Sequence, residues 1–182
     1  MKLFACAVAL ALCFPFGSIA EKPKVGRPMI QAIEKTLEPQ LARLWPDDPL
    51  SVVGIPEGMY INGYGAVFST EVNLAPAAAI TPFHQTISKE EVERTHHKKL
   101  ERMARFKAAM EDMLMSSAAS LDPVPADEQI TLGVSFFYWY WEDTTGLPAQ
   151  VVMHAPKKAL VMVKSGLADR STLASALSVQ EF

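Results

Sequence analysis

The feature that most constrains the fold of this chain is a long helical pattern in its middle. Ser88-Lys89-Glu90-Glu91 forms a capping box, in which Ser88 bonds a free backbone N–H and Glu91 reaches back to the cap. Apolar side chains then recur at three- and four-residue steps, at Val92, Leu100, Met103, Phe106, Met110, Met113, Leu114 and Leu121. The pattern predicts one amphipathic helix over 88–121, ended by Pro123 and Pro125 because proline cannot continue the hydrogen-bond ladder. Such a helix requires another layer of structure against which to bury its apolar stripe.

On both sides of this helix the pattern changes to that of strands. Between residues 64 and 74, larger and smaller side chains alternate with a period of two, which is typical of a half-buried strand. We predict strands over 52–55, 59–61 and 65–74, a fourth over 130–141 and its hairpin partner over 149–154. The polar segment 142–148, with its Gly and Pro, connects the last two.

Shorter helical patterns flank these strands. Pro28 and the apolar spacing that follows it predict a helix over about 28–45. Pro156 predicts a short helix to about Lys164, and Asp169 caps a last one. Because helices and strands occur in separate blocks, we predict an α+β fold, an antiparallel sheet packed against one long helix, with flanking N- and C-terminal helices.

The N-terminus predicts export. Lys2 precedes an uninterrupted apolar run over 3–14, shorter than the ~20 residues needed to cross a bilayer. Small residues at Ser18 and Ala20 then occupy the positions read by a signal peptidase. We predict a signal peptide over 1–20, a polar leader over 21–27 and a single domain over 28–182, in the periplasm or secreted. The alternative is an N-terminal membrane anchor.

The composition excludes several classes of protein. Lysine and arginine number 17 against 20 aspartates and glutamates, whereas a dedicated nucleic-acid binder carries a basic excess. Both cysteines, Cys6 and Cys13, lie in the predicted signal peptide, so the mature chain uses neither disulfides nor thiolate chemistry. No later segment is apolar enough to predict a transmembrane span.

The polar residues complete no familiar catalytic pattern. His96 and His97 are adjacent and diverge by about 100° on a helix, whereas a catalytic zinc needs three protein ligands. The sequence has no Walker A or dinucleotide loop, and we expect no metal and no cofactor. Carboxylates at Glu71, Glu142 and Asp143 leave open a hydrolase of envelope polymers, if two of them lie at the separation that such chemistry needs.

The run Phe136-Phe137-Tyr138-Trp139-Tyr140-Trp141 is the most distinctive apolar segment. In a strand its aromatic rings would cover both faces. Either both faces are buried, in the core or in a homodimer, or one face forms a platform for a ligand, with acidic residues at its rim. The candidate binding residues are Phe137, Trp139, Trp141, Glu142, Asp143 and Tyr64.

Two stretches carry a resemblance. Gly63-Tyr64-Gly65-Ala66-Val67-Phe68, and Trp141-Glu142-Asp143 with Gly146-Leu147-Pro148, resemble stretches shared by a set of exported bacterial proteins with no assigned activity. This resemblance implies export in a bacterium and supplies neither a fold nor catalytic residues. We therefore predict an exported, non-catalytic cell-envelope protein that binds a protein partner, a glycan or a lipid-linked component through the aromatic strand and the adjacent loop. A carboxylate-dependent hydrolase and a self-associating structural protein are the alternatives.

Overall fold

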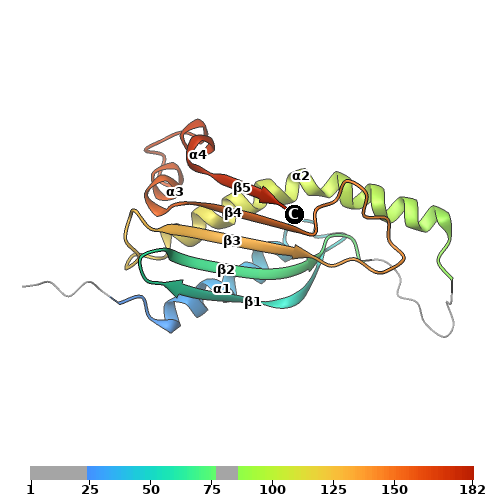
Figure 1. Cartoon of the computed structure of the whole chain (residues 1–182), viewed down its shortest axis with the longest axis horizontal. Coiled ribbons are helices and arrows are strands. Elements are labelled where there is room, and N and C mark those ends of the chain that lie inside the picture. The colour runs from blue at the N-terminus through green and yellow to red at the C-terminus, as the bar shows by residue number, and fades with distance from the viewer. Residues whose placement is uncertain (1–23, 77–85) are drawn as a thin grey trace, which may run out of the picture.

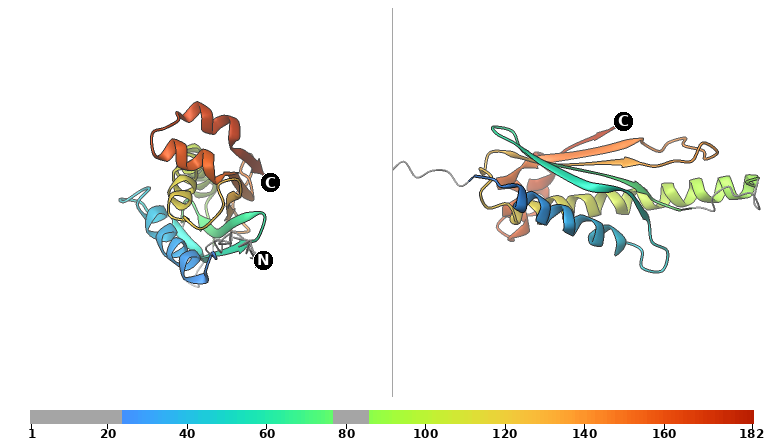
Figure 2. Two further views of the ribbon diagram at one scale, coloured as in Figure 1. Left: turned by 90° about the vertical axis from the view of Figure 1, so that its left-hand side faces the viewer. Right: turned by 90° about the horizontal axis from the view of Figure 1, so that it is seen from below.

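The computed structural model, which describes residues 24–76 and 86–182, is a five-stranded sheet with helices on one face (Figures 1 and 2). It confirms the predicted α+β fold with one long helix. The elements in chain order are α1 (Arg27–Ala42), β1 (Ser51–Ile61), β2 (Gly65–Asn73), α2 (Lys89–Ala119), β3 (Gln129–Phe136), β4 (Gln150–Pro156), α3 (Lys157–Lys164), α4 (Arg170–Ala176) and β5 (Ser178–Glu181).

The strands follow the order β1-β2-β3-β4-β5 across the sheet. Three of the neighbouring pairs are antiparallel, but β2 and β3 are parallel, in register from Gly65 opposite Gln129 to Val72 opposite Phe136. The sheet is therefore mostly antiparallel, as predicted, and the β2–β3 pair is the exception. Helix α2 supplies the crossover that a parallel pair requires, because it returns the chain to the end of the sheet where β2 began.

One hydrophobic core lies between the sheet and the helices. Its strand side chains come from alternate positions, such as Phe68 of β2 and Leu132 of β3, and its largest helical contributor, Phe106, packs edge-to-face on Phe136 with 5.4 Å between ring centroids. Helix α1 adds Ile30, Ile33, Leu37 and Leu41. No helix among the described residues covers the other face of the sheet, which we call the open face (Figure 2).

Helix α2 begins as predicted and carries a different buried stripe at its N-terminal half. Ser88 caps it, with its Oγ accepting a hydrogen bond from the Glu91 N–H at 3.2 Å. Leu100, expected on the buried stripe, is 39% exposed, whereas Lys99 is completely buried. This half of the helix extends beyond the sheet (Figure 2), so its inner face meets the loop between β3 and β4 instead of the apolar sheet.

The strand β1 differs from its prediction because it is continuous over 51–61. The segment Pro56-Glu57-Gly58, predicted as a turn, lies inside the strand, which absorbs extra residues through register shifts between Val52 and Gly54 and between Gly54 and Glu57. At the outer edge of β1, the N–H of Gly58 donates to Glu34 Oε1 at 2.7 Å and its carbonyl accepts from Arg27 at 2.8 Å. The ion pair of α1 thus satisfies backbone groups that an edge strand would otherwise expose.

Several predictions concern residues outside the described ranges. The signal peptide over 1–20 and the first residues of the leader lie there, as do His84 and most of the connection between β2 and α2. In the part of the chain that the structure describes, no helix combines the length and hydropathy needed to cross a membrane.

Candidate binding site at the aromatic loop

The aromatic run forms a loop and not the predicted strand. Strand β3 ends at Phe136, and the next N–H, of Phe137, still donates to the Val72 carbonyl of β2 at 2.8 Å. The chain then turns, with the Glu142 N–H donating to the Trp139 carbonyl at 3.0 Å. We call residues 137–149 the aromatic loop. The flat strand face assumed for both the platform and the dimer interpretations therefore does not form.

A buried ion pair joins this loop to α2. Lys99 Nζ bonds Glu142 Oε2, and both side chains are 1% exposed. The remaining polar contacts of the pair go to the backbone of the loop, because Lys99 also donates to the Phe137 carbonyl at 3.2 Å and Glu142 Oε1 accepts from the Trp139 N–H at 3.3 Å. Burial lowers the pKa of Lys99, and the Glu142 carboxylate opposes that shift.

Three further contacts hold the loop. The Tyr138 hydroxyl donates to the Pro148 carbonyl at 2.8 Å, and its ring lies 4.6 Å from Lys99 Nζ. Burial, reinforced by the charge of Glu142, raises the pKa of Tyr138 to about 12, so the hydroxyl keeps its proton at neutral pH. The Asp143 carbonyl bonds His96 Nδ1 at 2.8 Å.

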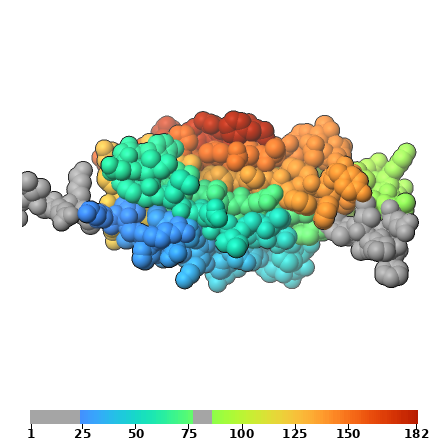
Figure 3. Space-filling model, turned by 60° about the horizontal axis from the view of Figure 1, so that its bottom comes forward, coloured from blue at the N-terminus to red at the C-terminus, as the bar shows by residue number. Residues whose placement is uncertain are grey.

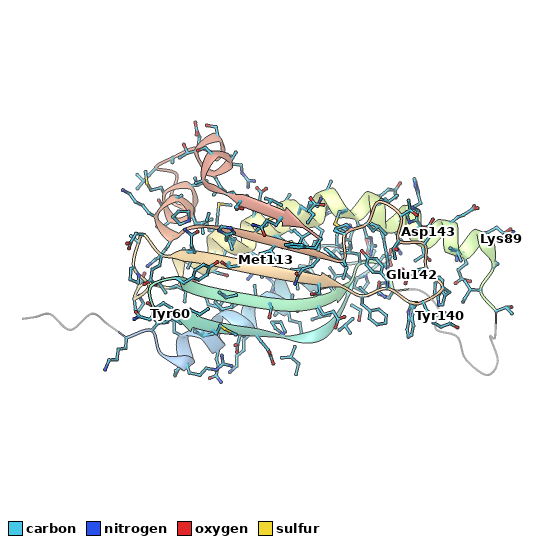
Figure 4. The ribbon with its side chains drawn as sticks, in the orientation of Figure 1. Tyr60, Lys89, Met113, Tyr140, Glu142 and Asp143 are labelled. Atoms are coloured by element: carbon cyan, nitrogen blue, oxygen red, sulfur yellow. The ribbon has the colours of Figure 1, made fainter. Side chains whose placement is uncertain are left out.

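The loop keeps aromatic surface available to a ligand. Tyr140 is 85% exposed, and Trp139 and Trp141 are half-buried. The Trp139 ring is fixed edge-to-face against Phe137, with centroids 5.0 Å apart. Figure 4 places Tyr140, Glu142 and Asp143 together at the end of the molecule where α2 begins. These rings therefore form an ordered, amphipathic surface, with the hydroxyls of Thr144 and Thr145 and the carboxylate of Asp143 nearby in the same loop.

Tyr64 does not belong to this site. It lies in the turn between β1 and β2, and its hydroxyl bonds Thr131 Oγ1 at 3.0 Å, at the start of β3. The aromatic loop follows the other end of β3, so the two lie at opposite ends of the sheet. The other five predicted residues are all in the aromatic loop, and among them Glu142 is a buried positioning group and not a rim residue.

The carboxylates considered for hydrolysis do not converge. Glu142 faces α2 beyond the end of the sheet, where Lys99 neutralises it, whereas Glu71 lies on the open face. Asp143 is exposed, and the Thr145 hydroxyl and N–H hold the pKa of its carboxyl below the usual value. Within residues 24–76 and 86–182, no group of three or more His, Cys, Asp or Glu side chains could hold a metal ion.

The functional residue that sequence analysis missed is Lys99. It follows Thr95 by four residues and precedes Met103 by four, and both of these neighbours are buried. That spacing places Lys99 on the inner stripe of the helix, where a lysine needs an acidic partner. Helical periodicity could therefore have identified the position, although not the partner.

Comparisons with protein-family models, with curated proteins and with solved structures find no match for this chain.

Proposed function

We propose that this protein is an exported, non-catalytic protein of the bacterial cell envelope that binds a glycan through the aromatic loop. The observation that carries this proposal is the buried Lys99–Glu142 pair, which holds an exposed aromatic segment in one conformation. Removing two charges from water offsets most of their attraction, so a buried pair adds little net stability and is better suited to specifying a conformation. A loop ordered before binding loses less entropy when a ligand arrives.

A sugar fits the chemistry of this loop. Aromatic rings offer a negatively polarised face to the C–H groups of a sugar ring, and neighbouring polar atoms can bond its hydroxyls. Tyr140 supplies an open ring, and the exposed residues Asp143, Thr144 and Thr145 supply hydrogen-bonding groups.

The charges around the loop favour this ligand over an anionic lipid. Binding to acidic headgroups requires a local excess of basic residues. The first turns of α2 beside the loop carry both signs in similar numbers, with Lys89, Arg94 and Lys98 among Glu90, Glu91, Glu93 and Glu101. The part of the surface next to the aromatic rings therefore has no cationic excess for phosphate.

Export rests on the expected signal peptide over 1–20. Expression of the full chain in a Gram-negative host, followed by fractionation and N-terminal sequencing, should yield a periplasmic or secreted product that begins at Glu21. Retention in the cytoplasm with Met1 intact would contradict this part of the proposal.

Glycan binding is tested by co-sedimentation with purified peptidoglycan and with insoluble neutral polysaccharides. Replacing Tyr140 by alanine should weaken binding by about tenfold, a typical loss for a central aromatic contact, without changing the melting temperature. Leu167→Ala, at a side chain that is 77% exposed in the turn after α3, is the matched control and should bind like the wild type. Equal binding by the Tyr140 and Leu167 variants, or no glycan binding by the wild-type protein, would refute the assignment.

A further inference from the structure

The open face of the sheet has a charge pattern unlike that of the rest of the molecule. None of the five strands contains a lysine or an arginine. Glu57 and Glu71 point to this face, whereas Glu181, the remaining acidic residue of the strands, bonds Lys107 on α2 at the opposite side. The strand side chains on the open face therefore include two carboxylates and neither a lysine nor an arginine.

The two carboxylates border a hollow of about 570 Å³ on this face. The hollow exists because the side chains that line its floor are small, at Gly54, Ser69 and Ser135. The first register shift of β1 lies at Gly54, where an added Cβ would approach the Cβ of Glu71 to 3.3 Å. Within the part of the chain that the structure describes, neither Glu57 nor Glu71 has a hydrogen-bond or ion-pair partner.

Exposed apolar side chains continue along β1 from this hollow, which Ile55 lines, past Met59 to Ile61. Ile55 is 86% exposed, Met59 59% and Ile61 46%. Contiguous exposed apolar residues mark association surfaces, whereas scattered single ones do not. Figure 3, which is turned toward the β1 edge, shows the blue α1 below the strands that form this face.

The structure also indicates how a partner would lie on this face. Addition of a strand to the edge of β1 is disfavoured, because Pro56 has no N–H to donate and the Arg27–Glu34 pair already bonds the backbone of Gly58. A second copy of the same face is disfavoured as well, because it would bring carboxylates against carboxylates. A partner must therefore dock across the face through its side chains and must carry positive charge.

We propose that the open face docks a segment of a partner protein in which lysine or arginine alternates with apolar residues. The cation binds between Glu57 and Glu71 in the hollow, and the apolar side chains pack on Ile55, Met59 and Ile61. This site is distinct from the aromatic loop and does not depend on the proposed glycan binding. The protein would then join two components of the envelope.

The test uses a fluorescein-labelled decapeptide of alternating arginine and isoleucine, with fluorescence anisotropy as the readout. The Glu57→Gln/Glu71→Gln double variant should bind at least tenfold more weakly than the wild type. Glu38→Gln/Glu93→Gln removes the same charge from exposed positions on α1 and α2 and should keep wild-type affinity. Since all four side chains are at the surface, both double variants should keep the wild-type melting temperature.

Other outcomes would overturn the proposal. Equal weakening by the two double variants would show that the peptide follows net charge and not this face. Equal binding of a peptide in which glutamate replaces arginine would exclude recognition of the cation. If Ile55→Ser leaves the affinity for the peptide unchanged, the exposed apolar side chains of β1 take no part in binding. A dimer in sedimentation equilibrium that Ile55→Ser dissociates would assign the face to a second copy instead.

Discussion

Replacement of Lys99 by methionine tests whether the buried ion pair holds the aromatic loop. Methionine has a similar volume and removes the charge, which leaves the Glu142 carboxylate 1% exposed and without its cation. It also removes the bond to the Phe137 carbonyl. Removing one partner of a buried pair costs about 3–5 kcal/mol of unfolding free energy. We expect a loss in this range in urea denaturation followed by far-UV circular dichroism.

The companion variants separate the charge from the packing. Glu142→Leu alone should cost a similar amount, because it leaves a buried lysine cation. The Lys99→Met/Glu142→Leu double variant leaves no buried charge, so it should cost much less than the sum of the single changes. It also removes the bond between Glu142 and the Trp139 N–H. The fluorescence of Trp139 and Trp141 should therefore show that these side chains move more freely than in the wild type. Additive costs, or a loss below about 1 kcal/mol for Lys99→Met, would refute the role assigned to this pair.

The pH dependence of stability offers an independent check on Lys99. Its pKa in the folded protein is lowered by burial, so the unfolded chain holds this proton over the interval between the lowered pKa and 10.5, its ordinary value. Stability rises with pH wherever the unfolded state binds more protons. The unfolding free energy of the wild type should therefore rise relative to that of Lys99→Met as pH increases through this interval, and a flat difference between the two proteins would contradict the burial of a charged lysine.

Three further predictions concern local contacts. Tyr138 has its pKa raised to about 12 against 10.0 in the unfolded chain, so the folded state holds the proton longer and stability should fall as pH rises from about 10 to 12. Because burial also raises the pKa of Tyr60, alkaline unfolding of Tyr138→Phe should show a smaller decline and not a complete loss of it. Ser88→Ala removes the cap of α2 and should cost about 1 kcal/mol in urea denaturation, whereas an unchanged midpoint would mean that the cap contributes nothing. Glu34→Ala frees the N–H of Gly58 at the edge of β1 and should increase aggregation at constant protein concentration, as measured by light scattering, with Glu38→Ala as the control on the same helix.

Much of the fold was predictable because its signals are local. The cap at Ser88, the helical spacing after it and the alternation from Ala66 to Val72 depend only on residues a few positions apart. The end of β3 was not predictable in this way, since Phe137 and Trp139 have strand-forming side chains. They leave the sheet because Glu142 binds the Trp139 N–H and is itself held by Lys99, which is 43 residues away in the sequence.

The candidate site shows the same division. Composition alone identified the aromatic residues 137–141 as unusual, and five of the six predicted binding residues do lie in one loop. The roles of the six residues depend on contacts between distant parts of the chain, which the sequence does not show. Glu142 is buried against Lys99, and Tyr64 bonds Thr131 at the other end of the sheet.

The sequence by itself determined where most of the helices and strands form and which face of most of them is apolar, because these properties repeat with the period of the local backbone. Only the tertiary structure decided that β2 and β3 run parallel, that the short strand β5 completes the edge of the sheet, and that one face remains uncovered. A local apolar pattern shows that a face is buried, but it does not show which other element packs against that face. In this protein, the packing is decided by the crossover of α2 and by charged side chains that come together only when the chain is folded.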